Sequence, residues 1–190
     1  MFILRKIVLK NQKRKKFCAA VISNHRSYTN FRLHFINELN KYKKVDMGGS
    51  YNNNVGKVID KVKFLTDYKF SIAMENSEGD GYMSEKIIQS FMAGTIPIYY
   101  GDYMVDEFIN PKSYILIRGE KDMKQKIEYI KKINEDENLY KKILRENIIL
   151  DINIKKKIED QKQKFLMNIF EQDINKAKRV DKFQIKNQKL

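Results

Sequence analysis

Short apolar runs alternate with segments of helical periodicity along residues 17–133, and this alternation limits the fold more than any other feature. The runs FCAAVIS (17–23), KFSIAM (69–74) and TIPIYY (95–100) have no helical period and are bounded by polar residues, as buried strands are. Strands that alternate with helices predict an α/β fold with a Rossmann-like parallel sheet and flanking helices. Two further short strands are expected, one at the start of 43–56 and one at 113–117.

The segments between these runs have the apolar spacing of amphipathic helices. In 30–42, apolar residues recur every four positions and so share one helix face. Segment 84–94 has Ser84 as a candidate N-cap and Gly94 as a candidate stop. The other predicted helices are 57–68, with Val58, Ile59, Val62 and Leu65 on its apolar face, and one or two helices within 121–147.

Pro97 conflicts with this reading, because it falls inside the apolar run 95–100. Proline has no N–H and cannot donate to a sheet ladder. We therefore expect that Pro97 either opens the strand or directs its nitrogen to a side without a partner.

The net charge of +14 is concentrated at the two ends of the 190-residue chain. Residues 1–16 carry +7, residues 155–190 carry +6, and the middle carries +1. We expect a domain at 17–150, a basic leader at 1–16 and a basic amphipathic helical tail at 151–190. Basic ends suit an anionic membrane surface or a nucleic acid, and a solvated lysine-rich surface without a partner explains them equally well.

Signals for a cellular compartment are few. Cys18 is the single cysteine, which excludes an internal disulfide and fits a reducing compartment. No apolar run approaches the ~18 residues that span a bilayer, and the charged start is a poor signal peptide. We expect a cytoplasmic protein whose tail either lies on a membrane or packs onto the domain through its apolar residues. These residues are Ile158, Phe165, Leu166, Ile169 and Phe170.

Polar residues and glycines cluster in 75–86, directly after the expected strand 69–74. Ligands of parallel sheets bind outside the carboxyl ends of the strands, so the cluster lies where a ligand would. Lys86 is in the first turn of the next helix, where a lysine disfavours the helix itself but favours a bound phosphate. Glu85 and Asn76 offer hydrogen-bonding groups for sugar hydroxyls. The pattern indicates a site for a nucleotide that carries a sugar.

This nucleotide site would not be one of the common glycine-rich types. The sequence contains neither a Walker motif nor a G-x-G-x-x-G motif. A charged surface turn, with Ser84 as the cap and Glu85 favoured by the helix dipole, is the alternative.

The stretch YKFSIAMENSEGDGYMSEKIIQSFMAGTIPIYYGD (68–102) resembles the signature of the α1,3/α1,4-fucosyltransferase family. FINPKSYILI (108–117) resembles a second, weaker family motif, and the similarity runs over about 13–150. The resemblance implies the C-terminal, donor-binding half of a GT-B glycosyltransferase, in which two Rossmann-like halves face each other across a cleft. It also implies transfer of L-fucose from GDP-fucose to a hydroxyl of a glycan acceptor, with inversion at the anomeric carbon.

Five residues match family positions that contact GDP-fucose. By resemblance, Arg32 and Lys86 neutralise the diphosphate. Asn76, Tyr82 and Glu85 correspond to residues that contact the nucleotide sugar. Two fixed cations would stabilise the charge that develops on the departing GDP, so no metal is obligatory.

Other residues are weaker candidates for a role. Arg26 competes with Arg32 for the diphosphate, but Arg32 lies in the better-matched frame. His25 and His34 are too few and unpaired for a metal site, and the sequence has no Asp-x-Asp motif. No cofactor other than the donor substrate is expected.

The main departure from the family concerns the acceptor-binding half. Inverting transfer needs a general base, which the family places on a carboxylate in the N-terminal half. Only about sixteen residues precede the first expected strand, too few for a Rossmann-like domain. We therefore expect no catalytic base in this chain, and a fragment, a split-gene product or a shortened relative. A non-catalytic module for GDP or a GDP-sugar is the alternative, and a nucleic-acid binder is disfavoured because the charge is terminal.

Overall fold

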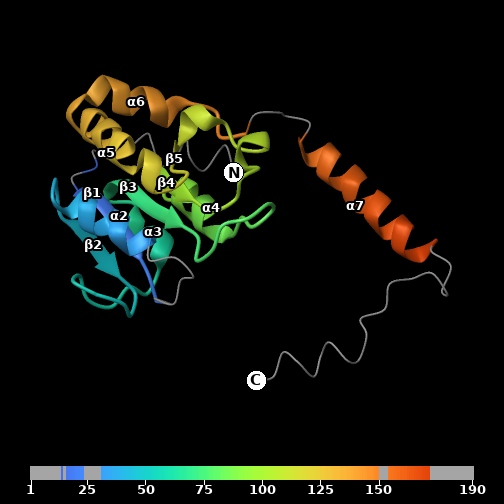
Figure 1. The fold of residues 1–190 in the computed structure, drawn as a ribbon, viewed down its shortest axis with the longest axis horizontal. Helices are drawn as coiled ribbons and strands as arrows, with labels where there is room; N and C mark the ends of the chain where they lie inside the picture. The colour runs from blue at the N-terminus through green and yellow to red at the C-terminus, as the bar shows by residue number, and fades with distance from the viewer. Residues whose placement is uncertain (1–13, 15, 24–30, 150–153, 172–190) are drawn as a thin grey trace. The chain divides into compact units, whose positions relative to one another are not determined.

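The computed structural model describes residues 14, 16–23, 31–149 and 154–171 (Figure 1). The chain divides into two compact units, residues 1–150 and residues 151–190.

The first unit is built on a sheet of five parallel strands, as the sequence predicts (Figure 1). Their order across the sheet is β2-β1-β3-β4-β5. This is the flavodoxin-like order of doubly wound α/β folds. The strands are β1 (Lys16–Val21), β2 (Val45–Gly48), β3 (Tyr68–Met74), β4 (Ile96–Tyr100) and β5 (Ile115–Leu116).

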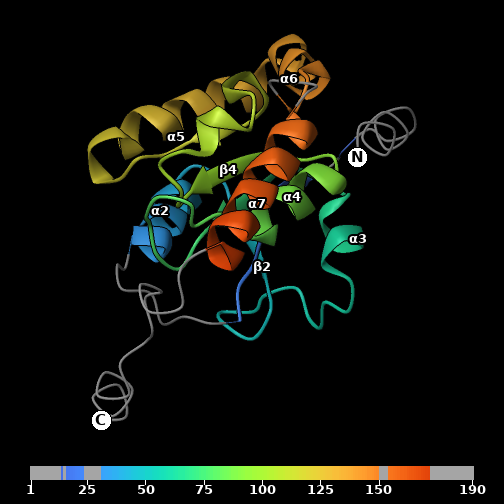
Figure 2. The same cartoon turned by 90° about the vertical axis from the view of Figure 1, so that its right-hand side faces the viewer.

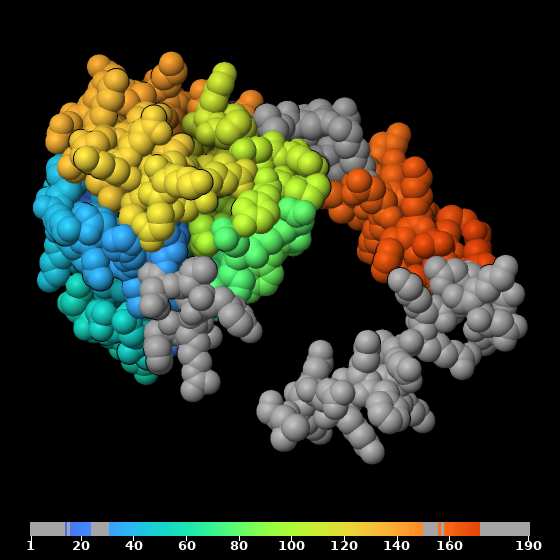
Figure 3. Space-filling view, viewed as in Figure 1, coloured from blue at the N-terminus to red at the C-terminus, as the bar shows by residue number. Residues whose placement is uncertain are grey.

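Helices cover both faces of the sheet. Figure 2 shows α2 (Phe31–Asn40) and α5 (Glu120–Glu135) on one side and α3 (Lys61–Leu65) on the other. In the space-filling view α5, in yellow, lies against α2, in blue (Figure 3). The remaining elements of this unit are α4 (Glu85–Met92), α6 (Glu137–Arg145), and the short 3-10 helices η1 (Val105–Glu107) and η2 (Pro111–Ser113).

Alternate residues of the central strand β3 explain the two layers. Phe70, Ile72 and Met74 join the buried cluster that includes α2 and α5. Ala73 joins a second cluster with Ile87 of α4. Successive side chains of a strand point to opposite faces, so a strand that is apolar throughout is buried on both. α4 therefore lies on the face opposite to α2 and α5.

Pro97 does not interrupt the sheet, because its nitrogen faces β5 at a position before the pairing with β5 begins. Pro97 lies within β4, opposite Ser71 of β3. The Tyr99 carbonyl accepts a hydrogen bond from Ile117 on the β5 side, and backbone groups of alternate residues face the same side. The Pro97 nitrogen thus faces β5, with which pairing begins only at Ile98. No ladder hydrogen bond is lost.

The prediction of a helix at 57–68 is wrong in its length. The helix spans only Lys61–Leu65, because the Asp60 side chain accepts a hydrogen bond from the Lys63 N–H and caps it there. Ile59, expected on the apolar face, lies before this cap and is 90% exposed.

Arg14, in the expected leader, is a buried residue of the first unit. Its guanidinium donates hydrogen bonds to the carbonyls of Thr66, Tyr68 and Ala93, at 2.8, 2.9 and 2.9 Å. These carbonyls follow α3, begin β3 and follow α4, so Arg14 joins three segments. Lys16, the last residue of the expected leader, is already the first residue of β1, and residues 1–13 and 15 lie outside the described residues.

The second unit contains α7 (Ile154–Phe170), so the predicted helical tail is present. Its described apolar residues are exposed, Phe170 by 81% and Phe165 by 63%. Within the described residues, no helix has the length and apolar character needed to cross a membrane. Residues 172–190 of the expected tail lie outside the described part of the chain.

Candidate functional site

The predicted site residues lie where the chain changes direction across the sheet. After β1 the chain crosses to β2 on one side, and after β3 it crosses to β4 on the other. Neighbouring strands whose connections diverge leave a crevice at their carboxyl ends, where ligands of doubly wound sheets bind. Glu75 and Asn76 follow directly after β3 at this edge.

Glu75 is fully buried and organises the start of α4. Its Oε1 accepts hydrogen bonds from the backbone N–H and the Oγ of Ser84, at 2.9 and 2.7 Å. Its Oε2 lies 2.6 Å from Nζ of Lys86. Ser84 also caps α4 through the Lys86 N–H. The carboxylate therefore fixes both the cap and the first lysine of the helix.

Lys86 keeps capacity for a ligand in this arrangement. Its Nζ donates to Glu75 and, at 3.0 Å, to Ser84 Oγ. An ammonium group has three donors, so one remains beyond these two contacts. The side chain is 23% exposed.

Arg32 approaches the same point from the opposite face of the sheet. Arg32 is the second residue of α2 and is only 4% exposed. Its Nη1 donates a hydrogen bond to Oδ1 of Asn76 at 2.7 Å. Burial lowers the pKa of Arg32, and the nearby Glu75 carboxylate opposes this effect. An arginine remains charged despite such a shift.

Two cations are thus held at the carboxyl end of β3 by consecutive residues. Asn76 contacts Arg32 of α2, and Glu75 contacts Lys86 of α4. Because α2 and α4 cover opposite faces of the sheet, the two positive groups flank the end of the strand. This arrangement can hold an anion with more than one charged group, such as a diphosphate.

Tyr82 and Glu85 are near this centre in sequence, and the Glu85 carboxylate is linked to it through a hydrogen bond with the Ser84 side chain. Tyr82 is 46% exposed, and its backbone N–H donates to the Gly79 carbonyl at 3.2 Å. Glu85 is an exposed first residue of α4. Its pKa lies below the ordinary value, chiefly because the carboxylate accepts a hydrogen bond from its own backbone N–H, with Lys86 and Lys61 adding to the effect. A charged acceptor for ligand hydroxyls results.

The residues that support the loop before α4 have no signal in the sequence pattern. Asp102 is buried and its Oδ1 accepts hydrogen bonds from the N–H groups of Gly81 and Met104, both at 2.9 Å. Arg118 donates to the Asp102 carbonyl at 3.1 Å. At Gly101, with φ +154°, a Cβ would lie 2.5 Å from Cγ of Glu75. These residues follow β4 and β5 in the chain, and only the folded sheet brings them beside the loop.

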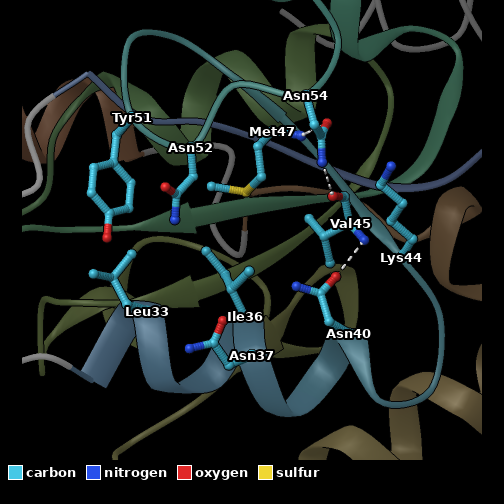
Figure 4. Close-up of a pocket in the computed structure, with 10 residues that line it drawn as sticks. All are labelled: Leu33, Ile36, Asn37, Asn40, Lys44, Val45, Met47, Tyr51, Asn52 and Asn54. Carbon is cyan, nitrogen blue, oxygen red and sulfur yellow. Dashed lines mark hydrogen bonds between the residues drawn. The ribbon is translucent and has the colours of Figure 1, made fainter.

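A separate cavity of about 350 Å³ lies between α2 and the loop after β2 (Figure 4). Its apolar residues include Leu33, Ile36 and Met47, and among the described residues Lys44 is the one charged residue that lines it. None of the five predicted site residues lines it. The Asn40 and Asn54 side chains accept hydrogen bonds from Val45 and Met47, so they support strand β2.

The described residues contain no group of three or more His, Cys, Asp or Glu side chains that could hold a metal ion. His34 Nδ1 lies 2.8 Å from Oε1 of Glu120 and links α2 to α5. His25 and Arg26, the other candidates that the sequence raised, lie outside the described residues.

Most of the chain is similar in sequence to a known protein family. Residues 11–184 match the family model described as glycosyltransferase family 10 (fucosyltransferase), C-terminal. This chain belongs to that fucosyltransferase family. The resemblance read from 68–102 is therefore confirmed.

Curated relatives in this family are longer than this chain. An α-(1,3)-fucosyltransferase of Helicobacter pylori is 40% identical over 114 residues, which cover 60% of this chain and 24% of the bacterial protein. A putative fucosyltransferase of Acanthamoeba polyphaga mimivirus is 32% identical over 149 residues, covering 72% of this chain and 24% of the viral protein. The chain thus spans about a quarter of each relative.

Solved structures support the same placement. A crystal structure of an α1,3-fucosyltransferase with GDP-fucose is 36% identical, with a TM-score of 0.69, and covers 74% of this chain and 41% of its own. A structure with GDP is 35% identical, with a TM-score of 0.72, and covers 79% of this chain and 44% of its own. The predicted fold class, one half of a GT-B fucosyltransferase, is confirmed.

Proposed function

We propose that this chain binds GDP-fucose at the carboxyl end of β3 and serves the transfer of L-fucose to a glycan hydroxyl. The observation that carries the proposal is the placement of Arg32 and Lys86 on either side of that strand, held by Asn76 and Glu75. A family relative of known structure binds GDP-fucose. In this proposal, Asn76, Tyr82 and Glu85 contact the nucleotide sugar.

The two cations have a direct chemical role in the proposed reaction. When the bond between fucose and GDP breaks, negative charge develops on the leaving diphosphate. Positive groups that are already fixed in place stabilise that charge more in the transition state than in the ground state. The proposal therefore requires no metal ion and no further cofactor. The acceptor attacks the opposite face of the sugar, and the anomeric configuration inverts.

The proposed reaction needs a second part to bind the acceptor. The matched region covers 41% of the solved relative with GDP-fucose. We propose that the general base and the acceptor-binding surface lie in a separate N-terminal half, and that the described residues supply the donor site alone. A non-catalytic module that holds GDP or a GDP-sugar is the second candidate, because the diphosphate contacts by themselves require no acceptor.

We also propose that the protein is cytoplasmic and attaches peripherally to anionic membranes through α7. Ile158, Phe165, Leu166 and Ile169 recur at helical spacing and are all exposed. Segment 155–190 carries a charge of +6, which favours an anionic lipid surface. Nucleic acid is not a proposed partner.

Calorimetric titration tests the donor site with GDP, UDP, ADP and a single-stranded oligonucleotide. We expect micromolar binding of GDP and a clear preference for it over the other three ligands. Lys86→Ala should weaken GDP binding about tenfold or more, since a charged hydrogen bond contributes roughly 1.5–3 kcal/mol. Lys142→Ala, an exposed lysine of α6, is the control and should bind as the wild type does. Equal affinity for GDP and UDP, or an unaffected Lys86→Ala variant, would contradict the proposal.

A transfer assay separates the two candidate functions. Fucose transfer from GDP-fucose to a lactosamine-type acceptor is measured with the chain alone and with an added N-terminal half from a family relative. Transfer in the presence of the added half favours the enzyme part. GDP binding without transfer in either sample favours the module.

A further inference from the structure

Lys61 is a charged residue beside the site that the family motif does not include. It is the first residue of α3, which leads from β2 to β3, while α4 leads from β3 to β4. Both helices connect parallel strands, so both begin at the carboxyl edge of the sheet. α3 and α4 also contact each other on the same face. The start of α3 is therefore a neighbour of the start of α4.

The Lys61 side chain is half-buried, and among the described residues it makes no hydrogen bond or ion pair. Two other half-buried lysines have partners, whereas Lys126 of α5 has none among the described residues. Lys69 donates to the Asn134 carbonyl and pairs with Glu137, and Lys86 pairs with Glu75. Burying an ammonium group without a partner is unfavourable. An anionic ligand would supply the contact that Lys61 lacks.

The pKa of Lys61 is affected by charged groups of the site. Burial lowers the pKa of Lys61, the Glu85 carboxylate raises it, the Lys86 ammonium lowers it further, and the Glu75 carboxylate raises it. Lys61 in turn contributes to the lowered pKa of Glu85. Its ammonium group is thus close enough to interact with both charged residues in the first turn of α4.

The charges at the site indicate what the Lys61 ammonium group could bind. The carboxylates of Glu75 and Glu85 offset the positive charges of Arg32 and Lys86. A further cation at the same edge would add to the attraction that Arg32 and Lys86 exert on a diphosphate. We propose that Lys61 is a third cationic contact for the diphosphate of the bound nucleotide. This inference rests on the proposed function and adds a binding residue to the same site.

Titration of the full chain with GDP and guanosine tests the contact. Lys61→Met keeps the apolar stem and removes the charge, while Lys61→Arg keeps the charge. Lys63→Met is the matched control, because Lys63 is exposed in the same helix. We expect Lys61→Met to weaken GDP binding about tenfold at low ionic strength, with a smaller effect in 0.5 M salt, roughly where screening shortens the range of charge interactions to a few Å. Guanosine binding should be unaffected, and both other variants should stay within about threefold of the wild type.

Each outcome of the titration supports or overturns the proposed contact between Lys61 and the diphosphate. Unchanged GDP affinity in Lys61→Met overturns this inference and leaves the proposed donor site standing. An equal loss for GDP and guanosine shows that Lys61 acts through the fold or the nucleoside, which also overturns the diphosphate contact. If the wild type binds no GDP, both this inference and the proposed function fail. Recovery of affinity in Lys61→Arg supports it, because only the charge is then restored.

Discussion

At the scale of single residues, the site depends on a buried carboxylate. Glu75 has no exposed surface, yet it receives hydrogen bonds from Ser84 and Lys86. A buried charge is tolerated when it is paired and its oxygens are satisfied. The ion pair is therefore both a stabilising contact and the means by which Lys86 is held for a ligand.

Replacing Glu75 by glutamine should destabilise the fold, because the Lys86 ammonium loses its charged partner. Removing one member of a buried pair costs about 3–5 kcal/mol, and the partial exposure of Lys86 reduces this to about 2 kcal/mol. Urea unfolding of Glu75→Gln measures the change. Glu107→Gln, an exposed control, should stay within about 0.5 kcal/mol of the wild type. Equal stability of the two variants would show that the pair contributes little.

The sequence indicates the two cations but not what holds them. Arg32 and Lys86 were predicted from a family pattern and from the chemistry of a helix start. The roles of Glu75 and Asp102 depend on contacts between strands that are distant in the chain, such as Asp102 with Gly81. The spacing of residues within one segment of the sequence does not indicate such contacts.

At the scale of elements, the strands and the starts of α2 and α4 follow the sequence pattern closely, whereas the start of α3 does not. β1, β3 and β4 fall within about two residues of the apolar runs from which they were predicted, because the core requires continuous apolar strands buried on both faces. α3 is shorter than expected because one side chain, Asp60, sets its beginning. Apolar periodicity continues past such a cap and cannot reveal it.

Arg14 provides a test at this scale, since it joins segments around α3, β3 and α4. Arg14→Ala should lower the free energy of unfolding by about 3 kcal/mol, because buried carbonyls lose their donor at roughly 1–3 kcal/mol each. Chemical denaturation followed by circular dichroism measures this loss. Arg145→Ala, at the exposed end of α6, is the control and should change stability little. A stable Arg14→Ala variant would indicate that water replaces the guanidinium at little cost.

At the scale of the whole molecule, the two compact units suggest separable roles. Residues 1–150 contain the sheet and every predicted site residue, and residues 151–190 contain α7. The sequence predicted both parts from the shift to a basic, helical composition. It could not indicate whether the apolar residues of α7 meet a membrane or the domain, since both readings need the same pattern.

Truncation after residue 150 tests the proposed membrane role. The shortened chain should retain its cooperative unfolding and GDP affinity and lose binding to vesicles that contain anionic lipid, as measured by co-sedimentation. Full-length Phe165→Ser/Phe170→Ser should bind vesicles more weakly, because both side chains are exposed apolar groups of α7. Vesicle binding that survives truncation would exclude α7 as the attachment site. A shortened chain that fails to fold would instead show that the tail packs onto the domain.

The central claim is that Arg32 and Lys86 hold a guanosine diphosphate between them at the carboxyl end of β3. A crystal structure of the chain with GDP tests it most directly. We predict that the diphosphate lies within hydrogen-bonding distance of both side chains, on the crevice side of Glu75 and Asn76. GDP bound elsewhere, or a diphosphate that contacts neither cation, would contradict the account.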